Sequence, residues 1–254
     1  MTREMNLNNV AAAIFCTGER TKKLTEYSLR QVGINDIIVI DNSDSFKEKY
    51  LQFASQGLEL NKNYFIRVDG DHIVFSGVLE LLEKAEKENY DWLTGVVHDY
   101  VMNRYRGGTP QILKRTVLEM LLENSDLMPE SQKPESIFSE NIRHRCKMGD
   151  VKIFTALHEY EQYPSKVCNS FLNRLHRNHY PRLYDDKYLQ SLPDDYKRAI
   201  EAAFESYANN KKKISMSFVN FEFLDKNFEP LNEKELETIY KHYKDAYNKY
   251  IILS

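Results

Sequence analysis

Two aspartates separated by a single glycine, Asp69-Gly70-Asp71, follow an apolar run at 64–68 that predicts a buried strand. In an extended chain, side chains two positions apart point to the same side, so both carboxylates face one point. Like charges that close are costly unless a cation or a donor-rich ligand lies between them. A hard divalent ion such as Mg²⁺ or Mn²⁺ takes oxygen ligands and can bridge a diphosphate. The tripeptide therefore fits a metal site, although a plain turn that caps a helix is the commoner use of such residues.

Other polar residues follow two further apolar runs, at 10–16 and 37–40. Runs that are apolar throughout are typical of strands in parallel sheets that helices cover on both faces. Apolar residues with helical spacing separate the two runs, so a strand, a helix and a strand predict a right-handed crossover in an open α/β sheet. Ligands bind outside the carboxyl ends of such strands. The residues expected at that edge are Thr17, Glu19, Arg20, Asp41, Asn42, Asp69 and Asp71.

The composition is that of a folded chain, since 254 residues with 42% hydrophobic content can bury one good core, or one core with a small appendage. The net charge of -3 offers no basic field for nucleic acid, which we do not expect as a partner. The three cysteines lie far apart, so they suggest no disulfide framework and fit a reducing cytoplasm. The apolar run near the N-terminus is too short for a bilayer, and we expect no transmembrane segment.

Further patterns extend the sheet and then give way to helices. We expect a mostly parallel α/β sheet with helices on both faces in residues 1–165, and a mainly helical region packed on it in residues 166–254. Four tyrosines recur in the last predicted helix, where a packing stripe is favoured over a face that stacks on sugar or lies on a membrane. The segments are 77–90 (helix), 91–97 (strand), 165–180 (helix), 194–210 (helix), 213–225 (strand) and 232–253 (helix), and the tyrosines are Tyr240, Tyr243, Tyr247 and Tyr250.

Five segments, taken in order, resemble the nucleotide-sugar-binding domain of GT-A glycosyltransferases, most closely the family 2-like group. They are AAIFCTGER, IIVIDNSDS, YFIRVDGDHIV, YRGGTPQILKRTVLEML and SENIRHRCKMGDVKIF, and they span about residues 10–165. The resemblance implies a GT-A (Rossmann-like) fold and an inverting, hexosyltransferase-type enzyme that uses a nucleotide-diphosphate sugar, with a UDP-sugar favoured, and Mn²⁺ or Mg²⁺. The run VIDNSDS lacks the glycine that is common in this loop of the family, and the third acidic residue sometimes seen in the metal motif is absent.

The resemblance also implies roles for individual residues. The family's DxD motif corresponds to Asp69-Gly70-Asp71, with Asp71 as a metal ligand and Asp69, in the same metal site, facing the ribose or the donor sugar. Members of this fold often add a histidine after the last core strand, which makes His158 a further metal ligand, unless it is a packing or surface histidine. The weaker candidates are His72 and His98, and the residues assigned to a uridine-type pocket are Thr17, Glu19 and Asp41.

Two more segments receive roles from the resemblance. Gly107 and Gly108 stand in a predicted loop where the family brings backbone against the donor sugar, and Gly108 has no Cβ to prevent that approach. A plain loop is the alternative. Glu140 matches the family's acidic motif, and an inverting transferase needs one carboxylate to take the acceptor's proton. Asn141, however, stands where a second acid is common, and the alternative is a helix start in which Ser139 caps and Glu140 favours the dipole.

These features predict a metal-dependent glycosyltransferase that transfers a sugar to a hydroxyl of a glycan, a lipid-linked molecule or a protein, as in polysaccharide biosynthesis. We expect it to be cytoplasmic, or peripheral at a membrane surface. One alternative is a sugar nucleotidyltransferase, which the segment CTGERTKK disfavours because it lacks a glycine-rich, lysine-bearing signature after the first strand. The other is a non-catalytic binding protein with a GT-A-like fold.

Overall fold

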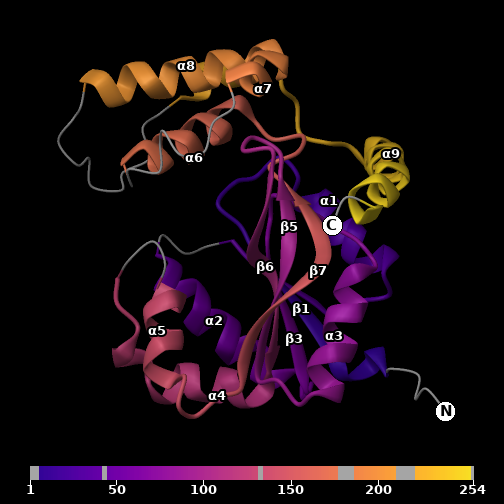
Figure 1. The fold of residues 1–254 in the computed structure, drawn as a ribbon. Helices are drawn as coiled ribbons and strands as arrows, with labels where there is room; N and C mark the ends of the chain where they lie inside the picture. Colours follow the sequence, from indigo (N-terminus) through magenta and orange to yellow (C-terminus); the bar gives the residue numbers. More distant parts are fainter. Residues whose placement is uncertain (1–5, 42–44, 131–133, 177–185, 210–220, 253–254) are drawn as a thin grey trace.

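One mixed sheet forms the centre of the molecule in a computed structural model that describes residues 6–41, 45–130, 134–176, 186–209 and 221–252 (Figure 1). Within these residues, the strands lie in the order β2-β1-β3-β6-β5-β7-β4. Their bounds are β1 (Val10–Phe15), β2 (Ile37–Ile40), β3 (Tyr64–Asp69), β4 (His72–Val74), β5 (Trp92–Asp99), β6 (Arg104–Lys114) and β7 (Met148–His158).

Strand direction brings most carboxyl ends to one edge of the sheet. Strand β1 pairs in parallel with β2 and β3, and β5 pairs in parallel with β7. Strand β6 runs antiparallel between β3 and β5, and the short β4 runs antiparallel to β7 at the far side of the sheet. The other described strands all point the same way. This arrangement confirms the predicted fold class, a mostly parallel α/β sheet with helices on both faces.

Helices cover both faces because alternate residues of the apolar strands point to opposite sides. In β1, Val10, Ala12 and Ile14 pack in the apolar cluster under α1 and α3, whereas Ala11, Ala13 and Phe15 pack in the cluster under α2, α4 and α5. The helix bounds are α1 (Lys22–Gln31), α2 (Phe46–Glu59), α3 (Gly77–Lys87), α4 (Arg115–Glu123) and α5 (Pro134–Ile142), and the short 3-10 helices are η1 (Leu7–Asn9) and η2 (Ser125–Leu127).

Strand β4 has β7 on one side and hydroxyl side chains of α1 on the other. Three buried hydroxyl groups of the segment 21–28 bond to the backbone of β4 and of the turn before it, so these polar groups are satisfied without another strand. The bonds are Thr21 Oγ1 to the carbonyl of Gly70 (2.9 Å), Thr25 Oγ1 to the carbonyl of His72 (2.7 Å), and the amide of Val74 to Ser28 Oγ (3.0 Å).

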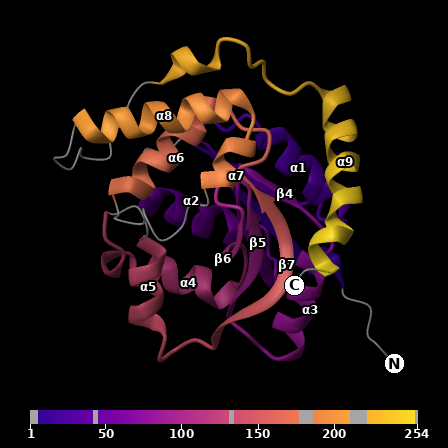
Figure 2. The same ribbon diagram turned by 45° about the horizontal axis from the view of Figure 1, so that its top comes forward.

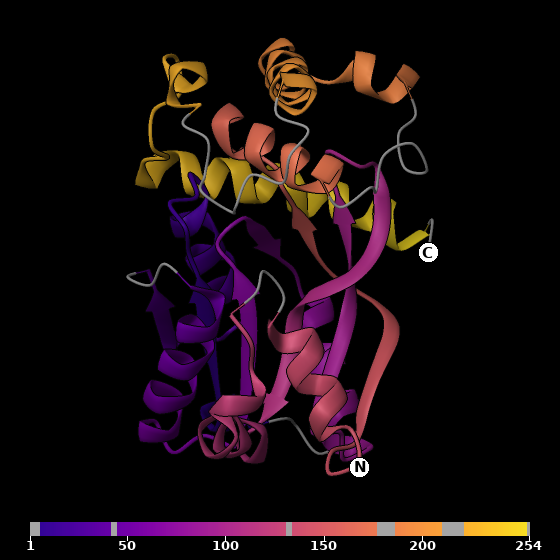
Figure 3. The same ribbon diagram turned by 90° about the vertical axis from the view of Figure 1, so that its left-hand side faces the viewer.

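The C-terminal helices lie over the carboxyl edge of the sheet and along one side of it (Figures 2 and 3). Helices α6 and α8 pack on each other and form an apolar cluster of their own. Helix α9 instead packs on α1 and on side chains from the β4–β7 side of the sheet. The bounds are α6 (Pro164–His176), α7 (Asp186–Ser191), α8 (Asp194–Asn209), η3 (Glu222–Asp225) and α9 (Glu233–Ile252). The mainly helical character of this region is thereby confirmed, and the division at residue 165 stays a prediction.

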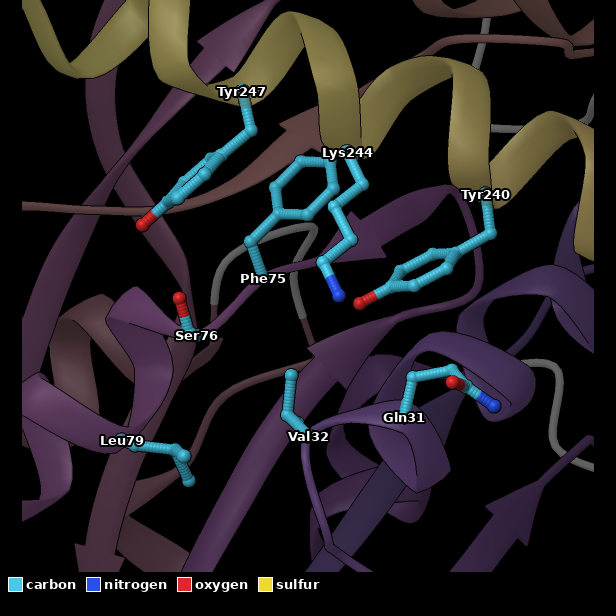
Figure 4. Close-up of a pocket in the computed structure, with 8 residues that line it drawn as sticks. All are labelled: Gln31, Val32, Phe75, Ser76, Leu79, Tyr240, Lys244 and Tyr247. Carbon is cyan, nitrogen blue, oxygen red and sulfur yellow. The ribbon is translucent and has the colours of Figure 1, made fainter.

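The tyrosines of α9 form a packing stripe, as expected. Figure 4 shows Tyr240 and Tyr247 on either side of Phe75, where they line a pocket of about 200 Å³ with Lys244. The side chain of Tyr250 lies outside the described ones. None of the helices in the described part of the chain combines the length and apolarity needed to cross a bilayer. The ring-centroid distances are 4.8 Å for Tyr247 and Phe75, 4.9 Å for Tyr243 and Tyr160, and 5.6 Å for Tyr240 and Tyr27.

Several local expectations were wrong. Gly107 and Gly108 lie inside β6 rather than in a loop, because this segment pairs with β5. Glu140 lies in the last turn of α5, since the helix begins at Pro134, so Ser139 caps no helix start. The predicted strand 213–225 is a 3-10 helix at its end, and 213–220 lies outside the described residues. No expected element corresponds to α2.

We expect Thr25→Val to lower the free energy of unfolding by about 1–3 kcal/mol, because it removes the hydroxyl but keeps the volume and leaves the buried carbonyl of His72 without its α1 donor. Thr25→Ser is the matched control, since it keeps the hydroxyl and loses only a methyl group. Urea denaturation followed by circular dichroism measures both variants. A smaller loss in Thr25→Val than in Thr25→Ser would show that the bond does not hold β4.

Candidate functional site

Three polar residues stand in a row where β5 and β7 end and the antiparallel β4 begins. His158 is the register partner of Asp99 on β5 and of His72 on β4. Directly opposite residues of paired strands point to the same face, so their side chains meet. All three are buried. His158 is thus the last residue of β7, not part of the following loop as expected, and His72, a weak candidate in the sequence, lies beside it.

Asp71 adds a carboxylate to this row. Its Oδ2 lies 3.2 Å from Nε2 of His158, and its Oδ1 lies 2.7 Å from Nδ1 of His72. The second contact is short and within ion-pair distance, and neither Asp71 Oδ1 nor His72 Nδ1 has a further partner among the described residues. One ligand atom from each of these three residues lies within 4.8 Å of the others. We call Asp71, His72 and His158 the central cluster.

Thr109 contacts both Asp69 and His72, and it bears on which nitrogen of His72 carries a proton. Its hydroxyl lies 2.9 Å from Oδ2 of Asp69 and 3.1 Å from Nε2 of His72. A hydroxyl has one proton, and an ionised carboxylate only accepts, so Thr109 donates to Asp69 and accepts from His72 Nε2. In neutral His72 this assignment leaves a lone pair on Nδ1 facing a carboxylate oxygen. Two lone pairs at 2.7 Å require a positive charge between or beside them, either a proton or a metal ion.

His158 is held by acids on three sides. Burial by itself would lower the pKa of His158, but the charges of Asp71, Glu159 and Asp99 outweigh burial and the opposing Arg106, and they raise that pKa to about 10. The pKa of Asp71 is low, because His158 and His72 outweigh the effect of burial. The pKa of Asp99 is low for the corresponding reason, with Arg174 as its main cation. Without a metal ion, a proton on His158 therefore balances the acids.

The residues after β7 are held in an unusual backbone conformation. Glu159 and Glu161 have φ values of 62° and 57°, in the left-handed region that costs a non-glycine residue about 1–3 kcal/mol. Arg174 of α6 bonds to the carboxylate of Glu159 at 2.9 Å and to Asp99 at 3.2 Å. Arg20 bonds to the backbone and carboxylate of Glu161. The C-terminal region thus fixes the exit of β7, and Arg20 is engaged there.

Asp69 and Asp71 have different surroundings although one glycine separates them. Asp69 pairs with the buried Arg67 at 2.7 Å, and its other contact is Thr109. It belongs to no metal-capable group among the described residues, whereas Asp71 does. The structure thus places Asp71, His158 and His72 together. Asp69 lies outside this cluster and pairs with Arg67.

The loop after β1 lies directly over the glycine of the Asp-Gly-Asp turn. A Cβ on Gly70 would stand 3.1 Å from both Cys16 Sγ and Glu19 Oε2, so a side chain there would have to displace one of these groups by a few tenths of an ångström. Thr17 donates its amide and hydroxyl to the carboxylate of Glu19. Burial raises the pKa of Glu19, and the charge of Asp71 raises it further. Two of the three residues assigned to the nucleotide therefore lie beside the central cluster.

Among the described residues, the remaining expected ones do not contact the central cluster. Asp41 pairs with Lys22 at the end of β2. The space above Gly107 is open, while a Cβ on Gly108 would meet Arg106 at 3.0 Å. His98 contacts Tyr160 and Asn103 instead of the cluster. Glu140 is exposed on α5, and none of the bonds among the described residues joins it to the cluster.

Sequence reasoning missed several residues that complete the site. Asp99 follows the same rule as Asp41 and Asp69, an acid at the end of an apolar strand, so this signal was present. Arg174 and Lys49 carried no such signal, because only folding brings Arg174 to Asp99 and Lys49 to the carbonyl of Cys16. The missed residues are Asp99, Thr109, Arg67, Arg106, Arg174 and Lys49.

The donor set of the central cluster fits a divalent ion. Two buried atoms without hydrogen-bond partners, Asp71 Oδ1 and His72 Nδ1, are suitable ligands, and His158 supplies a second imidazole once it loses its proton. Mixed carboxylate and imidazole ligands suit a transition ion such as Mn²⁺ better than Mg²⁺, which prefers oxygen. Such an ion could bind a diphosphate and stabilise charge on its oxygens.

No protein-family model matches the chain, and no curated protein sequence matches it. Among solved structures, the chain is similar to 4-diphosphocytidyl-2C-methyl-D-erythritol synthase of Anaerococcus prevotii, at 12% identity over 61% of this chain and 91% of that chain, with a TM-score of 0.46. It is also similar to a glycosyltransferase involved in glycosylation of the major capsid of PBCV-1, at 12% identity over 58% and 93%, with a TM-score of 0.38. A Mycobacterium tuberculosis protein solved with manganese is similar at 11% identity over 59% and 90%, with a TM-score of 0.39. Likenesses with TM-scores this low carry no argument about activity.

We expect Asp71→Asn to weaken Mn²⁺ binding more than about a hundredfold, since even residues outside the ligand shell commonly change metal affinity about 10- to 100-fold. Calorimetric titration of the purified protein with Mn²⁺ and with Mg²⁺ measures this without any substrate. Asp41→Asn is the control, because Asp41 is an acid at the same edge but outside the cluster. Equal Mn²⁺ affinity in Asp71→Asn and the parent would contradict the assignment.

Proposed function

We propose that this protein is a metal-dependent glycosyltransferase that uses a nucleotide-diphosphate sugar, with a UDP-sugar favoured. The central cluster of Asp71, His72 and His158 carries the proposal, because one ligand atom from each of these residues lies within 4.8 Å of the others at the edge of the sheet where β7 ends and β4 begins. That edge is where sheets of this kind bind ligands. The family resemblance of the same segments supplies the reaction type.

Each part of the site then has a task. A Mn²⁺ ion held by Asp71, His72 and His158 would supply Lewis-acid stabilisation of the departing diphosphate. Glu19, which lies against Gly70, and Thr17, which bonds to Glu19, contact the nucleoside with Asp41. The acceptor's proton goes to a carboxylate, for which Glu140 remains our candidate from the resemblance, and Gly108 is our candidate for backbone contact with the sugar.

Basic residues near the end of β1 favour one second candidate, a sugar nucleotidyltransferase. The amines of Lys49 and Lys166 bond to the consecutive carbonyls of Cys16 and Thr17. These two lysines come from α2 and α6 and reach the loop after β1. The segment CTGERTKK itself lacks the lysine-bearing signature of a nucleotidyltransferase. A nucleotidyltransferase would use such cations on a nucleoside triphosphate and would release pyrophosphate.

A panel of UDP-, GDP- and CDP-sugars with Mn²⁺ tests the proposal. We expect transfer or slow hydrolysis that releases a nucleoside diphosphate, and we expect Asp71→Asn to abolish it. Pyrophosphate formed instead from a nucleoside triphosphate and a sugar phosphate would show the second candidate to be right. Binding without either product in every combination would indicate a non-catalytic protein.

We expect Glu140→Gln to lower turnover about 10²- to 10⁴-fold, the usual contribution of a positioned general base, while donor affinity stays the same. Glu123→Gln is the control, because Glu123 is also an exposed helix residue but has no assigned role. Steady-state kinetics and calorimetric donor titration measure the two effects separately. Full turnover in Glu140→Gln would mean that another group takes the proton.

A further inference from the structure

Lys49 is a buried lysine at the ligand edge of the sheet. It lies on α2, its side chain is among the largest fully enclosed ones, and the residue is 2% exposed. Its amine donates to the carbonyl of Cys16, the residue that follows β1. The amine therefore reaches the carboxyl end of the sheet from the face that α2 covers, one strand away from both Asp41 and Asp69.

Four other cations near this edge have acidic partners. Each of these basic side chains lies within ion-pair distance of a carboxylate, so its charge is balanced by the protein. Lys49 differs, because no carboxylate oxygen among the described residues lies within ion-pair distance of its amine. Its contacts are the neutral carbonyl of Cys16 and, at 5.7 Å from the ring centroid, the ring of Phe46. The balanced pairs are Lys22 with Asp41, Arg67 with Asp69, His158 with Asp71, and Arg106 with Asp99.

A buried ammonium without a counter-charge is costly, because its hydration is lost and no anion replaces it. Burial lowers the pKa of Lys49, and the acids Glu19, Asp69 and Asp41, together with Cys16, oppose this effect without forming an ion pair. A purely structural role requires no charge, since a neutral donor could bond to the carbonyl of Cys16. An anionic ligand at this edge would supply the missing counter-charge.

We propose that Lys49 binds a phosphate group of the nucleotide diphosphate. This inference rests on the proposed function. It adds a phosphate contact on the side of the loop after β1 that α2 covers. An ammonium is a compact charge that suits phosphate oxygens, and the surrounding acids already have their own cations. A diphosphate would then lie between a bound metal ion near Asp71 and the amine of Lys49.

Calorimetric titration of nucleotides into the full chain with Mn²⁺ tests the assignment. The probe is whichever of UDP, GDP and CDP binds the parent most tightly, together with its free nucleoside. We expect Lys49→Met, which keeps the length and removes the charge, to weaken the diphosphate about 10- to 100-fold, the range for a hydrogen bond to a charged group. Nucleoside affinity should stay within about twofold, and the melting temperature should not fall.

Lys62→Met is the matched control, because the amine of Lys62 also bonds to a carbonyl, that of Asn8, but at the opposite edge of the sheet, where Asp36 balances it. It should leave both affinities unchanged. If Lys49→Met does not fold, Lys49→Gln removes the same charge and keeps a polar head, with the same expected loss.

The outcomes separate the two proposals. Equal diphosphate affinity in the parent and a folded neutral variant overturns the role of Lys49 and leaves the proposed function in place. An equal loss for nucleoside and diphosphate overturns the phosphate contact, because the amine would then bind the nucleoside. No binding of any diphosphate by the parent overturns the proposed function and this inference with it.

Discussion

The register of three strands is the constraint on which the site depends. Strand β4 has only three residues, and a shift of one position against β7 would turn His72 to the other face and separate it from His158. Pairing with β7 on one side and the hydroxyl groups of α1 on the other hold β4 in place. The Asp-Gly-Asp turn is therefore more than a loop, because it joins a central strand to a distant edge strand and carries Asp71 to the histidines.

The C-terminal helices take part in the same construction. Arg174 of α6 bonds to Asp99 and Glu159, and Arg20 and Tyr243 hold Glu161, so the strained exit of β7 is fixed from outside the sheet. A helical region that only covered the core would not need these bonds. A charged residue of α6 thus holds Glu159, which directly follows His158.

Charge balance describes how the site would receive a ligand. The acids of the edge are neutralised by arginines, by Lys22 and by a proton on His158, whose pKa is raised to about 10. A metal ion at Asp71 would replace that proton. A diphosphate would supply a counter-charge next to the ammonium of Lys49. The metal ion would thus add positive charge near Asp71, and the diphosphate would add negative charge near Lys49. The two additions partly cancel in the net charge of this edge of the sheet.

The sequence by itself determined the elements whose signal is local. Apolar runs such as 10–16 and 64–68 predicted buried parallel strands, and the rule that ligands lie at their carboxyl ends selected Asp69, Asp71, Thr17 and Glu19. The tertiary structure decided which of these meet and what completes them. The pairing of β4 with β7 made His72 a partner of His158, and α2 brought Lys49 to the loop after β1. Such contacts depend on strand order and register between distant segments, and no local pattern of residues records them.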